Sequence, residues 1–237
     1  MWMKASLTMK ILAFNGSPRK SNGMTDRLLD IFLESASKEG AEITKHYLSD
    51  LNINGCTGCF GCWWSTPGKC VQSDDMDWVL EQILDTDVIV WSSPIYHDNI
   101  IHSLQRLRER TLPLALPEFI LNKGEPSHPA RYKKQRKEVV IATAGFPESS
   151  AFDVVKRLFQ NATHIHLPAS AVLYEADKIP MIQEFIGNVE STAVKIVKGE
   201  EIDDELKDKL SLVYPPEVKN EIIRRHNEMS DNATPSG

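Results

Sequence analysis

The chain has 237 residues, of which 41% are hydrophobic and 25% are charged, and its formal net charge is -6. This length supports one well-buried core, or a core with an added arm. The acidic balance argues against nucleic acid or an anionic membrane surface as the main partner, because both attract clustered positive charge. No run approaches the roughly twenty apolar residues of a membrane span, and no secretory signal is apparent. We therefore expect a cytoplasmic protein that binds neither nucleic acid nor membrane.

Five short apolar runs predict the strands of a parallel sheet. Helical patterns separate them, which implies right-handed crossovers and helices on both faces of the sheet. The runs are "MKILAF" (9–14), "EITKHYL" (42–48), "DVIVW" (87–91), "EVVIAT" (138–143) and "THIHLPASAVL" (163–173). The pattern predicts an α/β fold in which residues 1–200 form the main domain.

Amphipathic patterns predict the helices. The predicted helices begin at Thr25, after a cap at Ser73 or Asp74, and near 103, 152 and 182, with one more after Pro215. Residues 112–137 contain four prolines that prevent long regular structure, so we expect an inserted loop or arm there. Residues 201–237 are expected to form a helical extension with a polar, disordered end at "SDNATPSG".

The first predicted strand ends in a turn of small residues, "NGSPRKSNGMT" (15–25). Such a turn ahead of a helix directs several backbone N–H groups and the positive end of the helix dipole at one point, which suits a phosphate monoester. Ser17 and Thr25 add hydroxyl donors, and Arg19 adds a charged donor. Neither a Walker lysine nor the glycine spacing of a dinucleotide fingerprint is present. An ordinary strand-to-helix turn is the alternative.

The third and fourth predicted strands end in loops that suit a flat heterocycle. In "SSPIYHDN" (92–99), Pro94 turns the chain outward and Tyr96 offers an aromatic face. In "ATAGFPESS" (142–150), Ala144 and Gly145 allow close backbone approach. Ligands of such sheets bind outside the carboxyl ends of the strands, where all three loops lie. The alternative for Tyr96 is packing on the rim of the core.

These loops resemble those of the flavodoxin-like family of NAD(P)H-dependent FMN reductases. "GSPR" followed by a threonine resembles the phosphate loop of that family, and "SPIYHDN" resembles its isoalloxazine loop. The resemblance implies a three-layer sandwich with a five-stranded parallel sheet in the order 2-1-3-4-5. It also implies cofactor contacts from Ser17, Arg19, Met24, Thr25, Pro94, Ile95, Tyr96, Asn99, Ala144 and Gly145. Met24 stands where the family usually has an asparagine, and Glu109 and Arg110 stand where an Asp-Arg pair is usual.

All four cysteines lie in one predicted loop, 54–72, at Cys56, Cys59, Cys62 and Cys70. The spacing, C-x2-C-x2-C and then a fourth cysteine, is typical of a compact iron-sulfur site. Glycines make the loop supple, and neighbouring aromatic residues can shield a cluster from water. Zinc and free or redox-active thiols are the alternatives. Together with the flavin loops, this run resembles the iron-sulfur flavoprotein branch of the family.

The resemblance implies an FMN-dependent oxidoreductase of electron transport. It would pass electrons from ferredoxin or NAD(P)H through a [4Fe-4S] cluster and FMN to an acceptor, as a homodimer or homotetramer. One alternative is an NAD(P)H-dependent FMN or quinone reductase without a cluster. Another is a non-catalytic flavin-binding redox sensor or a zinc-stapled interaction protein. In each case we expect no catalytic acid, base or nucleophile. The arm at 112–137 would be a dimer arm, a lid or a surface loop without a role.

Overall fold

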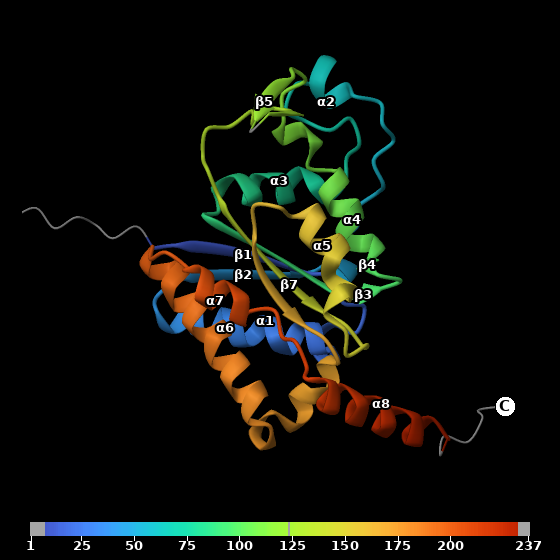
Figure 1. Ribbon diagram of the computed structural model, residues 1–237. Coiled ribbons are helices and arrows are strands. Elements are labelled where there is room, and N and C mark those ends of the chain that lie inside the picture. The colour runs from blue at the N-terminus through green and yellow to red at the C-terminus, as the bar shows by residue number, and fades with distance from the viewer. Residues whose placement is uncertain (1–7, 123, 232–237) are drawn as a thin grey trace, which may run out of the picture.

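The central sheet has the predicted strand order. The computed structural model describes residues 8–122 and 124–231, and its main strands pair in the order β2-β1-β3-β7-β8, all parallel (Figure 1). Their bounds are Lys10–Asn15 (β1), Glu42–Tyr47 (β2), Val88–Tyr96 (β3), Lys137–Thr143 (β7) and Thr163–Leu167 (β8). This order corresponds to the predicted 2-1-3-4-5, so the flavodoxin-like arrangement is confirmed.

The sheet has six strands rather than five, because β3 continues beyond its predicted end. Pro94 pairs in register with Thr143 of β7, and the chain reverses at His97 and Asp98, whose φ angles are 48° and 57°. The short strand β4, Asn99–Ile100, then pairs antiparallel with β3. A proline is accepted here because it lies near the end of the strand, where a missing N–H costs few ladder bonds.

Helices cover both faces of the sheet, so the predicted three-layer sandwich is confirmed (Figure 1). On one face, α1 (Met24–Lys38) and α6 (Pro180–Lys198) bury Phe32 and Phe185 in one core cluster. On the other, α3 (Met76–Asp85), α4 (His102–Glu109) and α5 (Asp153–Leu158) bury Met76 and Leu104 in a second cluster. Apolar side chains thus project from both faces of the sheet, as parallel strands covered on both sides require.

The last strand is shorter than "THIHLPASAVL" predicts. It ends at Leu167, because Pro168 cannot donate to the ladder and Ala169 takes a left-handed conformation with φ 46°. The chain then enters a 3-10 segment, η5 (Ser170–Lys178). The apolar residues after the proline therefore pack as helical turns and not as strand.

The remaining elements are short. They are η1 (Lys20–Asn22), η2 (Leu48–Asp50), α2 (Gly61–Trp64), η3 (Leu112–Leu114), β5 (Ile120–Asn122), β6 (Glu125–Ser127), η4 (Ser149–Phe152), α7 (Asp204–Lys209) and α8 (Pro216–Asp231). The predicted arm thus contains η3 and a small β5–β6 hairpin. Most of the predicted polar end, 232–237, lies outside the described residues. Within 8–122 and 124–231, no helix combines the length and apolar character needed to cross a bilayer.

Candidate functional site

Three loops that the sequence singles out meet at the carboxyl edge of the sheet. The backbone N–H of Gly16 donates to the Ser92 carbonyl at 2.9 Å, which joins the end of β1 to the middle of β3. The Thr25 and Thr143 hydroxyls lie 2.7 Å apart and are buried, which joins the start of α1 to the end of β7. The predicted phosphate loop therefore lies beside the predicted ring loops.

The turn between β1 and α1 is held by a network of its own. The buried Ser17 donates its backbone N–H to Asn15 Oδ1 at 2.7 Å, and its hydroxyl accepts from the Arg19 backbone N–H at 3.3 Å. Gly23 precedes α1, and no described side chain caps the helix there. A Cβ at Gly23 would lie 2.6 Å from Ser17 Oγ, so the close turn requires glycine. The backbone N–H groups of Asp26 and Arg27 already donate to the Gly23 carbonyl, so the donors open to an anion are those at the very start of α1.

A partly buried ionic network supports this turn. Asn15 Nδ2 donates to Asp26 Oδ1 at 2.6 Å, and Lys45 Nζ lies 2.8 Å from Asp26 and 2.6 Å from Asp30. Burial alone would lower the pKa of Lys45, but its hydrogen bonds to the two carboxylates outweigh burial and raise that pKa. The sequence analysis missed these residues, since a carboxylate in a helix's first turn and a lysine in a strand are both ordinary.

The predicted phosphate residues do not all face the same space. Ser17 and Thr25 are buried, whereas Arg19 is exposed and Met24 is half-buried. A surface hollow of about 660 Å³ runs along η1 and the first turns of α1. Its lining includes Arg19, Asn22, Gly23, Met24, Arg27 and Tyr174. Arg19 and Met24 thus face the outer side of the turn, and Ser17 and Thr25 its buried side.

The predicted ring residues form an open shelf beside the turn. Pro94 and Ile95 are half-buried, and Tyr96 keeps 50% of its surface exposed. Asn99 is exposed, and its side chain accepts from the Ile100 backbone N–H at 2.8 Å. Ala144 is buried, while a Cβ on the exposed Gly145 would meet nothing within 4 Å. The free space at Gly145 and the free face of Tyr96 fit a flat ring at this edge.

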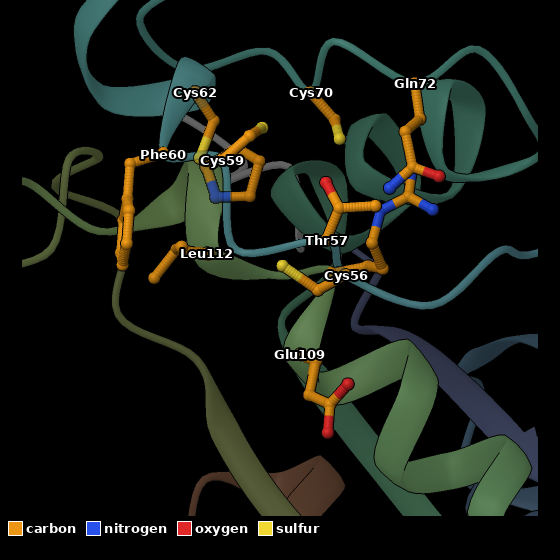
Figure 2. A pocket seen from close by; sticks show the side chains of 11 residues that line it. Cys56, Thr57, Cys59, Phe60, Cys62, Cys70, Gln72, Glu109 and Leu112 are labelled. Atoms are coloured by element: carbon orange, nitrogen blue, oxygen red, sulfur yellow. The ribbon is translucent and has the colours of Figure 1, made fainter.

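The four cysteines line a second site, a small cavity of about 20 Å³ (Figure 2). All four are free thiols; Cys56 and Cys59 are exposed, Cys70 is half-buried and Cys62 is buried. Burial, and next the neighbouring Cys70, raises the pKa of Cys62, whereas a backbone hydrogen bond from Gly61 lowers that of Cys59. The cavity walls also include Thr57, Phe60, Gln72, Glu109, Arg110, Leu112 and Pro113.

Three residues close the cysteine loop at its base, and we call Asn54, Asp74 and Arg110 the clasp. Both terminal nitrogens of Arg110 bind the Asp74 carboxylate, at 2.7 and 2.9 Å, and one also donates to the Asn54 carbonyl at 2.8 Å. Asp74 in turn accepts from the Asn54 backbone N–H at 2.9 Å. Burial alone would raise the pKa of Asp74, but these donors outweigh burial and lower it. From the sequence, Asp74 was expected as a possible helix cap, and its pairing with Arg110 was not predicted.

Helix α4 connects the two sites. At its start, the Ser103 hydroxyl lies 3.5 Å from the Gly16 carbonyl of the phosphate turn. Near its end, Arg106 donates to the Ile53 carbonyl at 3.0 Å, and Arg110 follows in the clasp. Eight residues of helix span about 12 Å. The cysteine cavity therefore lies at the opposite end of α4 from the phosphate turn.

The arm packs against the cysteine loop through a row of rings. Phe60 and Trp63 have ring centroids 5.1 Å apart, Trp63 and His128 4.8 Å, and His128 and Phe119 4.8 Å. A Cβ on Gly68 would lie 3.1 Å from the Tyr132 hydroxyl. The arm therefore covers one side of the loop that carries the thiols.

Four free thiols around one cavity fit a group that is bound by four thiolates. Within the described residues, no three His, Cys, Asp or Glu side chains are arranged to hold a single metal ion. The donor chemistry thus fits a cluster, while the anion-ready turn and the open shelf fit a phosphorylated flat ring.

Comparisons with known proteins identify the family of this chain and several relatives. Residues 9–171 match the family model of the NADPH-dependent FMN reductases. An iron-sulfur flavoprotein of Archaeoglobus fulgidus is 36% identical over 105 residues, which cover 44% of this chain and 46% of that protein. One of Methanocaldococcus jannaschii is 34% identical over 115 residues, covering 48% and 58%. The chain spans about half the length of the curated relatives it matches.

Solved structures show the same fold at low identity. An NAD(P)H:quinone oxidoreductase from Methanothermobacter marburgensis has a TM-score of 0.60 at 12% identity, covering 83% of this chain and all of that one. An FMN-dependent NADH-azoreductase from Bacillus anthracis, in complex with FMN, has a TM-score of 0.59 at 18% identity, covering 79% and 99%. The family model matches well over half of the sequence. The chain belongs to the NADPH-dependent FMN reductase family.

Proposed function

We propose that this chain is an FMN-dependent oxidoreductase whose cysteine cavity holds a [4Fe-4S] cluster. The observation that carries the proposal is the pairing of two sites on one fold. An anion-ready turn and an open shelf lie at the carboxyl edge, and four free thiols line one cavity at the other end of α4. Family membership supports FMN at the edge, and the names of the curated relatives support iron and sulfur at the thiols.

In this proposal the protein binds and orients its cofactors and supplies no acid, base or nucleophile. The first N–H groups of α1 and the hydroxyls of Ser17 and Thr25 hold the phosphate, with Arg19 and Met24 on the outer side of the turn. Pro94, Ile95, Tyr96 and Asn99 line the ring, and Ala144 and Gly145 allow the backbone to approach it. When bound, FMN exchanges one or two electrons and a cluster exchanges one, so the pair links one-electron and two-electron partners.

The four cysteines are the proposed cluster ligands. Their loop is fixed at its base by the clasp and covered on one side by the arm, which limits the access of water. The donor would be ferredoxin or a nicotinamide, and the protein would act as a homodimer or homotetramer. An FMN or quinone reductase without a cluster is the second candidate, favoured by the two exposed thiols and by the quinone reductase among the structural neighbours.

Anaerobic purification with cofactor analysis tests the proposal. We expect one FMN, about four irons and about four sulfides per chain, with flavin and broad iron-sulfur absorption. FMN without metal would favour the second candidate, and FMN with one zinc per chain would make the cysteines a zinc site. A sample with neither flavin nor iron would contradict both sites. Assays with NADH, NADPH and reduced ferredoxin then identify the donor, and a flavin-loaded protein without turnover would be a redox sensor.

A further inference from the structure

Arg110 has a buried donor that the protein itself does not satisfy. The side chain is 1% exposed, and the clasp uses both of its terminal nitrogens. Its Nε–H is buried, and within the described residues it has no hydrogen-bond acceptor. Leaving a buried donor unpaired costs free energy, so a native structure rarely keeps one without a reason.

The surroundings of this donor point to sulfur as its acceptor. Arg110 lines the same cavity as the four cysteines, and it interacts with the Cys70 side chain. Asp74 is already bound by the terminal nitrogens, so it does not compete for the Nε–H.

We propose that Arg110 is a positioning residue for the cluster, and that its Nε–H donates a hydrogen bond to the Cys70 sulfur of the loaded site. This inference rests on the proposed cluster. A reduced cluster carries one more negative charge than an oxidised one, so a hydrogen bond to a ligand sulfur stabilises the reduced form. Arg110 thereby raises the reduction potential of the cluster, and the bidentate contact with Asp74 fixes the direction in which the donor points.

Two variants separate the hydrogen bond from the charge pair. Arg110→Lys keeps a positive charge beside Asp74 but has no Nε–H. The double variant Arg110→Met with Asp74→Asn removes both charges together, so no buried charge is left unpaired. The matched control is Arg108→Lys, since Arg108 lies on the same helix and stacks on Phe159 at 4.1 Å without lining the cavity.

Anaerobic redox potentiometry with dithionite, followed by EPR, measures the potential in the anaerobically purified protein. We expect both Arg110 variants to keep the iron and sulfide content of the wild type. Their reduction should become about tenfold less favourable, a shift of about 59 mV to more negative potential. Arg108→Lys should keep the wild-type potential. In the wild type, 15N labelling of arginine should add a weak 15N coupling to the pulsed EPR spectrum of the reduced cluster, and Arg110→Lys should remove it.

The possible failures are distinguishable. A wild-type protein that holds FMN but no iron overturns the cluster and this inference with it. A loaded wild type with no 15N coupling, or loaded variants with the wild-type potential, overturn the role of Arg110 alone. Variants that keep the wild-type circular dichroism but hold no iron also overturn it, because Arg110 would then only close the loop.

Discussion

At the scale of single residues, Thr25 and Thr143 offer a matched pair for testing the phosphate site. Their hydroxyls share one buried hydrogen bond of 2.7 Å, but only Thr25 lies in the first turn of α1, where the proposed phosphate binds. A valine at either position removes the shared bond. A valine at Thr25 also removes a proposed donor to a charged group, and such a bond contributes about 1.5–3 kcal/mol.

We therefore expect Thr25→Val to weaken FMN binding roughly tenfold or more, and Thr143→Val to weaken it much less. Quenching of FMN fluorescence during a titration of the apoprotein measures both affinities. Equal losses in the two variants would mean that the shared bond, and not a phosphate contact, is what matters.

His166 makes folding stability depend on pH. Its ring is 1% exposed, stacks on Phe152 at 4.6 Å and lies 3.2 Å from both the Ser211 hydroxyl and the His164 ring. Burial, and next His164 and Lys156, lowers the pKa of His166 to about 3. Between the ordinary pKa of histidine and this value, the unfolded chain binds a proton that the folded protein does not.

Stability should therefore fall as the pH falls from about 6.5 toward 3, by about 1 kcal/mol per pH unit from this group. His166→Gln should reduce that slope, and Ser211→Ala, which breaks a contact of the same ring but keeps the imidazole, should retain it. Urea unfolding between pH 4 and 7 measures the slopes. An unchanged slope in His166→Gln would show that the ring is protonated in the folded state.

At the scale of elements, periodicity located the sheet because its strands are apolar on both faces. Residues 88–91 of the run "DVIVW" lie in β3 and are all buried, and "EVVIAT" lies in β7. Each of these strands needs covering helices on both sides, so the order of elements alone implied the layers. The common location of the small motifs at the strand ends could then be predicted as well, because the carboxyl ends of parallel strands share one edge.

Element ends were less predictable where long-range pairing competes with local signals. Pro94 reads as the start of a loop, yet register with Thr143 keeps it in β3. The clasp was also hidden, because Asp74 and Arg110 are 36 residues apart and only the fold brings them within 2.7 Å. Patterns of neighbouring residues carry no information about such a contact, whereas the compact spacing of the cysteines placed all four around one cavity.

At the scale of the whole molecule, the two sites are built from different parts of the fold. The phosphate turn and the ring shelf are made by strand ends, so they exist only once the sheet has formed. The cysteine site is made by one loop and is fixed to the sheet domain by the clasp and the arm. Figure 1 shows α2 and the β5–β6 hairpin together, beyond α3 and α4 and away from the sheet.

Because the clasp joins the two ends of the cysteine loop, we expect that the loop can be replaced without disrupting the rest of the fold. Asn54 and Asp74 are hydrogen-bonded to each other, and just outside them Asn52 and Asp75 bond through backbone and side chain at 2.6 and 3.1 Å. The two ends of the loop are therefore already joined. A short glycine-serine turn in place of 55–73 should leave the circular dichroism and the FMN affinity close to those of the wild type, and loss of folding would contradict this.

The contact between the two ends of the loop also affects how the loop can vary in evolution. A loop whose ends meet can be gained, lost or altered in sequence without disturbing the register of the sheet, because insertions at such points cost little chain entropy. The proposed cluster site and the proposed flavin site can then change independently within one scaffold, and α4, a helix about 12 Å long, connects them whatever the loop contains.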